Sequence, residues 1–361
     1  DLHLHAHLQS ERHAWRTTPG DVVVDAFAFS PDGKRLAVVM GDVENMPDIY
    51  LLNARRGKLP YKRRTRVNPQ VDTWKLPVIK EIAWTSPDGT TVHGILELPP
   101  GTDPVAGPTQ ALPTVVELHG GPSASTKLRL RFWIYGRTLF ATRGWALLSP
   151  NYRGSTGFGD RFMTDLIAHK NDRDVADILA GLDHIVEKGI ADPERLAVMG
   201  WSNGGYLTNC LITSTTRFKA ASSGAGVVDT VLQWMIEDTP GHVINFNQGF
   251  PWTKPEQMQR SSALYKADKI TTPTLIHVGE NDARVPAAHS RGLFRALYRY
   301  VDVPTELVIY PGEPHGLSIQ EHRKAKMQWD IEWFDHYVLR NGKAKPEAED
   351  AAAEAEKKAE D

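Results

Sequence analysis

One pentapeptide constrains the fold of this chain more than any other feature: Gly200-Trp201-Ser202-Asn203-Gly204 fits the pattern G-x-S-x-G. The apolar segment 195–199 precedes it and predicts a strand, and the segment 205–213 that follows has a helical pattern. In this context the serine occupies a sharp, strained turn, and the flanking glycines leave room for the chain to reverse. A glycine-rich loop without chemistry stays the alternative until partners for the serine are identified.

Strands and helices are predicted to alternate from about residue 76 to 342. The expected strands are residues 91–98, 115–119, 146–150, 196–200, 220–223, 274–279 and 306–310. The expected helices are residues 174–188, 204–213, 287–298 and 321–339. Such alternation predicts a mostly parallel sheet covered on both faces, and with the serine turn it predicts the α/β-hydrolase fold for residues 76–342.

The two ends of the chain differ from this middle region. Residues 1–75 read as short β segments (22–29, 36–40, 48–53), and the SPDG turn at 30–33, which recurs at 86–89, is common in β-propeller blades. We interpret this region as a remnant of one or two blades. Residues 343–361 are rich in alanine, glutamate and lysine, which predicts an acidic, solvated tail of low complexity.

Composition excludes several classes of protein. The 361 residues are 41% hydrophobic and 24% charged, with a formal net charge of −2, so neither nucleic acid nor an anionic membrane is an expected partner. No apolar run approaches the roughly 20 residues of a membrane-spanning helix. The single cysteine, Cys210, excludes an internal disulfide. The chain begins at Asp1 rather than methionine, which suggests a processed or truncated product, and its compartment stays open between cytoplasm, periplasm and secretion.

A serine hydroxyl needs a base, and in this fold an acid and then a histidine follow it in the chain, each just after a later strand. Asp282 follows the expected strand 274–279, and His315 follows the expected strand 306–310 in a tight loop. Glu280 is a rival for the acid, although it still belongs to the strand end. The other histidines are less well placed: His289, His322 and His336 lie on expected helices, and His277 lies inside an expected strand.

Acyl transfer also needs hydrogen-bond donors aimed at the developing oxyanion. The backbone N–H of Asn203, next to the nucleophile, is one candidate. The loop His119-Gly120-Gly121-Pro122 follows the expected strand 115–119, and the N–H of Gly121 is the second candidate.

These residues resemble the catalytic domain of the prolyl oligopeptidase family, and most of all its acylaminoacyl-peptidase-like branch. Four blocks carry the resemblance, in family order: HGGPSAS at 119–125, NYRGSTGFG at 151–159, GWSNGGY at 200–206 and GENDARVP at 279–286. Together with the loop that holds His315 they span about residues 80–340. The resemblance implies a serine peptidase with a β-propeller in front of the hydrolase domain, of which only the last portion would be present here.

The resemblance also implies substrate-binding residues. Arg284, two residues after Asp282, would bind a peptide carbonyl. An apolar specificity pocket would take Val227 and Trp234, with Met235 as a weaker candidate and Tyr206 as a further contact. Some relatives use a tyrosine hydroxyl at the position of His119 as an oxyanion donor; the histidine found here favours the Gly121 amide instead.

Two smaller patterns leave alternatives open. His3, His5 and His7 alternate along one strand face, which suits either a transition metal or, more commonly, an exposed edge. Phe246, Phe250 and Trp252 suit either a lid over the site or a satellite core.

The sequence therefore predicts hydrolysis of short peptides through a Ser202–Asp282–His315 triad, with no cofactor and no metal. A small-ester carboxylesterase of the same fold is the first alternative, and a binding module without catalysis is the second. The expected partners are short peptides and the missing propeller portion, as another part or another chain; a homo-oligomer is left open.

Overall fold

The computed structural model describes the backbone of residues 3–8, 11–16, 20–53 and 61–343, and the side chains from residue 20 onward within these ranges. Histidines 3, 5 and 7 lie on strand β1 (His3–Leu8), but their side chains, like the tail from residue 344 onward, lie outside the description. Within the described residues no helix has the length and apolar character that crossing a bilayer requires.

An eight-stranded sheet forms the centre of the molecule, with the order β14-β13-β12-β11-β9-β10-β8-β7. Strands β14 to β10 in this order run parallel, whereas β8 is antiparallel to both β10 and β7. The strands are β7 (Val78–Thr85), β8 (Thr91–Leu98), β9 (Leu112–Leu118), β10 (Ala146–Asn151), β11 (Ala191–Trp201), β12 (Ala220–Gly224), β13 (Thr274–Gly279) and β14 (Thr305–Tyr310).

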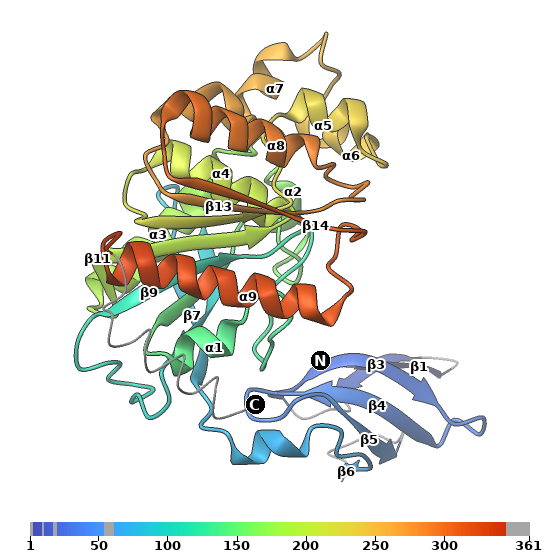
Figure 1. The fold of residues 1–361 in the computed structure, drawn as a ribbon. Helices are drawn as coiled ribbons and strands as arrows, with labels where there is room; N and C mark the ends of the chain where they lie inside the picture. The colour runs from blue at the N-terminus through green and yellow to red at the C-terminus, as the bar shows by residue number, and fades with distance from the viewer. Residues whose placement is uncertain (1–2, 9–10, 17–19, 54–60, 344–361) are drawn as a thin grey trace.

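Helices cover both faces of this sheet (Figure 1). On one face lie α1 and α9, which meet through the rings of Phe140 and Phe334. On the other lie α3, α4 and α8. The helices are α1 (Arg137–Thr142), α2 (Asp160–Thr164), α3 (Arg173–Glu187), α4 (Asn203–Ser214), α5 (Thr230–Ile236), α6 (Gly241–Asn247), α7 (Pro255–Arg260), α8 (Ala288–Arg295) and α9 (Gln320–Phe334). Short 3-10 or π segments are η1 (Pro69–Thr73), η2 (Ala263–Lys269), η3 (Ala296–Val301) and η4 (Asp335–Leu339).

Strands β10, β12 and β13 contain no Asp, Glu, Lys or Arg, because both of their faces are covered. Every residue of β10, β12 and β13 is buried, and this is why their side chains do not alternate between polar and apolar. Helix α4 is likewise buried from Asn203 to Thr213, and the thiol of Cys210 lies fully inside the core beneath it. The nucleophile turn is thereby fixed between a buried strand and a buried helix.

Glycine is required where α4 crosses the sheet. A Cβ at Gly204 would run into the carbonyl oxygen of Leu118 at the end of β9, and one at Gly200 would run into the backbone of Gly204. These contacts set helix α4 directly on the ends of β9 and β11, and so bring the oxyanion loop after β9 close to Ser202.

Antiparallel sheets make up the N-terminal region. Strands β1 and β2 (Glu11–Arg16) form a hairpin, and a four-stranded sheet follows in the order β3-β4-β5-β6, with β3 (Val23–Phe29), β4 (Arg35–Gly41), β5 (Asp48–Asn53) and β6 (Lys62–Arg63). This sheet has a core of its own, made of Leu36, Val38, Met40, Tyr50 and Leu52. It joins the larger domain through an Arg129–Asp25 ion pair of 2.6 Å and a hydrogen bond from Leu130 N to Asp42 O.

Candidate active site

Ser202 stands on the turn between β11 and α4 with the backbone angles φ 63° and ψ −120°. A non-glycine residue with positive φ is strained, and the surroundings hold it there: its N–H donates to Gly224 O at 2.9 Å, and its carbonyl accepts from Tyr206 N at 2.9 Å. The side chain is only partly buried, so the turn presents the hydroxyl at the carboxyl end of the parallel strands.

The structure brings Ser202, His315 and Asp282 together from the ends of three strands. His315 Nε2 lies 2.9 Å from Ser202 Oγ, and His315 Nδ1 lies 2.7 Å from Asp282 Oδ2. The other oxygen of Asp282 accepts the backbone N–H groups of Arg284 (2.9 Å) and Val285 (2.8 Å), which fixes the carboxylate. Trp201 Nε1 donates to His315 O at 2.7 Å and so ties the histidine loop to the nucleophile strand. This geometry is that of a nucleophile, a base and an orienting acid.

The rivals for these positions have other contacts. Glu280 is exposed and accepts the N–H of Gly312. His277 is fully buried between Asp330 (3.2 Å) and the hydroxyl of Tyr310 (3.0 Å). His289 is buried against the N–H of Val228, His322 binds Glu313, and His336 packs on Tyr337.

Both predicted oxyanion donors lie at the nucleophile. Asn203 is the first residue of α4, and Gly121 lies in the loop after β9 with φ 123° and a cis bond to Pro122. A Cβ on the neighbouring Gly120 would come 3.4 Å from Ser202 Cβ, so this loop passes directly beside the serine. Neither amide N–H donates to another atom in the described part of the chain, which leaves both available to an oxyanion.

His119 is turned away from this role. Its ring stacks on Tyr152 at 4.4 Å, its Nε2 lies 2.9 Å from Ser155 Oγ, and its Nδ1 lies 2.7 Å from Gly120 O. Tyr152, a residue of the NYRG block to which the sequence assigned no role, donates to His119 O at 2.7 Å and accepts from Asn203 Nδ2 at 3.1 Å. A tyrosine hydroxyl therefore connects the two loops that carry the candidate oxyanion donors.

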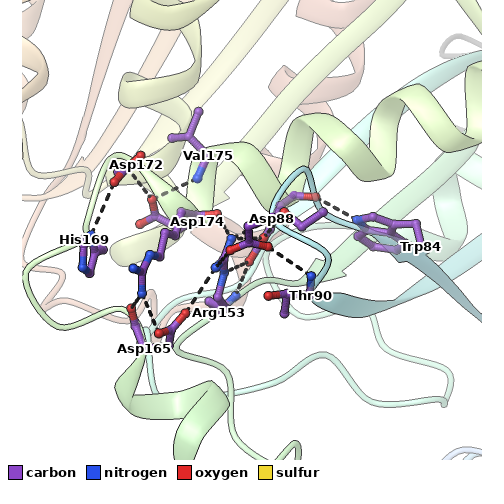
Figure 2. Close-up of polar contacts among 12 residues, drawn as sticks. Trp84, Asp88, Thr90, Arg153, Asp165, His169, Asp172, Asp174 and Val175 are labelled. Carbon is purple, nitrogen blue, oxygen red and sulfur yellow. Dashed lines mark hydrogen bonds and ion pairs between the residues drawn. The ribbon is translucent and has the colours of Figure 1, made fainter.

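Arg153, next to Tyr152, is a buried hub of ion pairs behind this loop (Figure 2). Its guanidinium binds Asp177 through Nε (3.0 Å) and Nη2 (2.8 Å), and it also contacts Asp88 and Asp165. Burial would raise the pKa of Asp88, but hydrogen bonds from Thr90 and Arg153 outweigh it and lower that pKa to about 2. Three carboxylates thus contact one guanidinium, and Asp165 also forms an ion pair with Arg173.

A cavity of about 850 Å³ opens beside the triad. Ser202, His315, Asn203 and Gly121 lie along it, and so do three of the residues named for substrate binding, Arg284, Tyr206 and Val227. Helix α6 contributes Phe246 to the lining of the cavity. Phe250 and Trp252 lie outside the lining and stack on each other at 4.9 Å.

Trp234 and Met235, also named as candidates for the specificity pocket, lie outside the lining of this cavity. Trp234 packs edge-on against Trp252 at 5.6 Å, and Met235 is 66% exposed. Helix α5 turns Gln233 towards the cavity instead, one position along the helix. Without the bounds of this short helix, the sequence could not show which of its side chains faces inward.

Arg284 lies in the cavity wall with its guanidinium already engaged. Its Nε donates to Asp238 Oδ1 at 2.6 Å, and both side chains are nearly half exposed. The backbone N–H of Asp238 also donates to Ala283 O. A substrate carbonyl would thus have to share the guanidinium of Arg284 with Asp238. The contacts between Asp238 and residues 283–284 also join the segment after α5 to the loop that carries Asp282.

Polar side chains that the sequence did not single out form the far end of the cavity: Lys170, Gln233 and His242, with Glu237 behind them. Gln233 Nε2 donates to Glu237 Oε2 (2.9 Å) and lies 3.2 Å from His242 Nε2, while His242 Nδ1 lies 2.9 Å from Thr239 O. His242 Nδ1 also lies 3.2 Å from Glu237 Oε1. Burial lowers the pKa of His242, which favours the neutral imidazole. No motif marked these residues, because they belong to loops and short helices.

Glu237 makes stability depend on pH. Burial raises the pKa of its carboxyl to about 7, although the hydrogen bond from Gln233 opposes the shift. The pKa of Glu237 is higher in the folded than in the unfolded chain. The contribution of this carboxyl to the free energy of unfolding is therefore fully present below about pH 4.5 and is lost as the pH rises through about 7. We expect Glu237→Gln to gain stability relative to the native chain between pH 5 and pH 8, measured by denaturant unfolding.

Glu187→Gln provides the control, because it makes the same change at an exposed carboxylate that folding does not bury. A free-energy difference between Glu237→Gln and the native chain that stays constant from pH 5 to pH 8 would contradict the raised pKa.

Comparison with known proteins shows the family of this chain. The family model described as the prolyl oligopeptidase family matches residues 133–340, more than half of the chain. The chain belongs to the prolyl oligopeptidase family. The predicted family and the α/β-hydrolase architecture are both confirmed.

Curated proteins similar to this chain include two that are named as peptidases and one named as an acylamino-acid-releasing enzyme. An uncharacterised peptidase, YuxL, of Bacillus subtilis is 27% identical over 87% of this chain and 47% of its own length. Acylamino-acid-releasing enzyme 1 of Oryza sativa subsp. japonica is 32% identical over 62% of this chain and 29% of its own length. Dipeptidyl aminopeptidase BIII of Pseudoxanthomonas mexicana is 31% identical over 85% of this chain and 45% of its own length. The chain thus spans less than half the length of these relatives.

Solved structures have the same fold. An acylaminoacyl peptidase in complex with Z-Gly-Gly-Phe-chloromethyl ketone superposes with a TM-score of 0.81 at 22% identity, over 94% of this chain and 52% of its own. A puromycin hydrolase superposes with a TM-score of 0.78 at 24% identity, over 91% of this chain and 49% of its own. At these identities the likeness concerns the fold.

Proposed function

We propose that this chain is the catalytic part of a serine peptidase that hydrolyses short peptides through an acyl-enzyme. The observation that carries the proposal is the continuous hydrogen-bonded line from Ser202 Oγ through His315 to Asp282, at 2.9 and 2.7 Å. The relatives named above, which include acylamino-acid-releasing enzymes and a dipeptidyl aminopeptidase, support peptides as the substrate class.

The geometry suits the two halves of such a reaction. Ser202 attacks the carbonyl carbon while His315 Nε2 takes its proton, and the imidazolium is stabilised by Asp282. The oxyanion forms between the N–H groups of Asn203 and Gly121. His315 then gives the proton to the leaving amine, and a water molecule, activated by the same imidazole, releases the acid from Ser202.

A matched pair of substrates tests peptide against ester as the substrate. The kcat/KM for an N-acetyl-aminoacyl peptide and for a short acyl ester are measured on protein whose active sites are counted by fluorophosphonate labelling. Peptide cleavage at a rate well above that of the Ser202→Ala blank is expected. Ester hydrolysis without peptide cleavage would favour the carboxylesterase alternative, and failure of folded protein to label would favour the binding module.

We further propose that the four-stranded sheet β3–β6 is a blade of a β-propeller whose remainder is another part or chain. The antiparallel neighbours in sequence order, the SPDG turn between β3 and β4, and the length of the relatives support this. The exposed outer residues Phe27 and Phe29, at 52% and 46%, suit contact with a neighbouring blade.

A further inference from the structure

Lys170 places a buried ammonium group in the wall of the catalytic cavity. It lies in the loop between α2 and α3, is only 8% exposed, and lines the same cavity as Ser202. Its Nζ lies 4.3 Å from the centre of the Tyr206 ring and 5.4 Å from that of Phe246. These aromatic faces stabilise the cation but accept no ordinary hydrogen bond from it.

No oxygen among the described residues accepts a hydrogen bond from this ammonium, and no carboxylate lies within 4.0 Å of it. Burial lowers the pKa of Lys170, and the charge of Asp174, at the start of α3, is the strongest one that opposes this shift. Asp174 Oδ2 is itself buried without a hydrogen bond. The other oxygen of Asp174 accepts the N–H groups of Asp172 and Val175 (Figure 2). A buried lysine carries three donors, so an unoccupied Nζ in a cavity wall indicates a place for an acceptor from outside.

The position of Lys170 in the cavity suggests contact with the acyl side of the scissile bond. Tyr206, on which the ammonium packs, is one helical turn after Ser202 on α4. Because His315 must reach the leaving group to protonate it, the acyl side of the substrate extends away from His315. The lining of the cavity also includes Val227 and Phe246, whose apolar side chains suit the methylene groups of a substrate side chain.

We propose that Lys170 selects substrates whose acyl-side residue ends in a side-chain oxygen, as glutamine and glutamate do, by donating a hydrogen bond to that oxygen. The inference rests on the proposed peptidase function and specifies its substrate class. A hydrogen bond to a charged group contributes about 1.5–3 kcal/mol, which corresponds to roughly 10–150-fold in kcat/KM between a matched substrate and one that leaves the ammonium unpaired.

The test uses p-nitroanilides of glutamine, glutamate and methionine, because methionine has a similar length without the oxygen. Each is prepared as the N-acetyl and as the free-amine form, and kcat/KM is expressed per site titrated with a fluorophosphonate. The native chain is expected to prefer glutamine or glutamate over methionine by at least about tenfold. Lys170→Met should abolish or invert this ratio, whereas Lys269→Met, at an exposed lysine outside the cavity, should keep it.

The outcomes separate this inference from the proposed function. A native chain that cleaves the anilides but prefers methionine, or a ratio that survives in Lys170→Met, overturns the role of Lys170 while the peptidase stands. A native chain that neither labels nor cleaves any anilide overturns the proposed function itself. Thermal unfolding checks that Lys170→Met folds. If it does not fold, the glutamine-to-methionine ratio of kcat/KM in the native chain and in Lys170→Gln tests the role of Lys170 instead.

Discussion

Ser202→Ala is expected to lower kcat for peptide hydrolysis by about 10⁴-fold or more and to leave the fold intact. The hydroxyl removed is the one that lies 2.9 Å from His315 Nε2, so the base loses the nucleophile from which it takes a proton. The backbone contacts that hold the turn, from Ser202 N to Gly224 O and from Tyr206 N to Ser202 O, do not involve the side chain. Activity and fluorophosphonate labelling should therefore disappear while the melting temperature is retained.

Ser214→Ala is the matched control for this substitution. Ser214 ends the same helix α4, is exposed, and bonds only the carbonyl oxygen of Cys210 within its own helix. It should keep native turnover. Because the triad acts as a unit, adding His315→Ala to Ser202→Ala should cost little more than either change alone. More than about a hundredth of native turnover in Ser202→Ala would contradict the assignment of the nucleophile.

Arg153→Met is expected to cost about 3–5 kcal/mol in the free energy of unfolding. The substitution removes the guanidinium that binds the fully buried Asp177 through two nitrogens, at 3.0 and 2.8 Å, and leaves that carboxylate with Ser86 as its remaining side-chain partner. An uncompensated buried charge is far more costly than the loss of a surface pair. Denaturant unfolding at pH 7 measures the effect.

Two further variants test whether the unpaired buried charge of Asp177 causes this loss of stability. Adding Asp177→Asn to Arg153→Met should recover part of the loss, because the double variant no longer buries an unpaired charge. Arg195→Met removes a partly exposed pair with Asp192, of 2.7 Å, and should cost less than about 1 kcal/mol. Equal losses in Arg153→Met and Arg195→Met would show that burial of the pair is not what matters.

Apolar segments made the large α/β sheet and its longer helices predictable from the sequence. The expected strands 91–98 and 274–279 coincide with β8 and β13, each of which has an uninterrupted stretch of buried residues with mostly apolar side chains. Strand β7 was not predicted: it lies at the edge of the sheet, where buried and exposed residues are mixed. Helices α5, α6 and α7 were also missed, since each has only six or seven residues and too few turns for a period to show.

The residues of the site likewise differ in how far the sequence could predict them. Ser202, Asp282 and His315 could be named because each follows a strand, and parallel strands bring their carboxyl ends to one edge. The cavity wall could not, since Gln233 rather than Trp234 faces inward only through the orientation of α5. Lys170 gave no signal because a lone lysine in a loop is ordinarily solvated.

The burial of the chain's single cysteine has a practical consequence. Cys210 lies within α4, two turns beyond the nucleophile, and burial raises the pKa of its thiol well above its usual range. A thiol reagent can therefore react only when this helix leaves the sheet. Its labelling rate under native conditions reports how often the scaffold of the nucleophile opens, without any engineered probe.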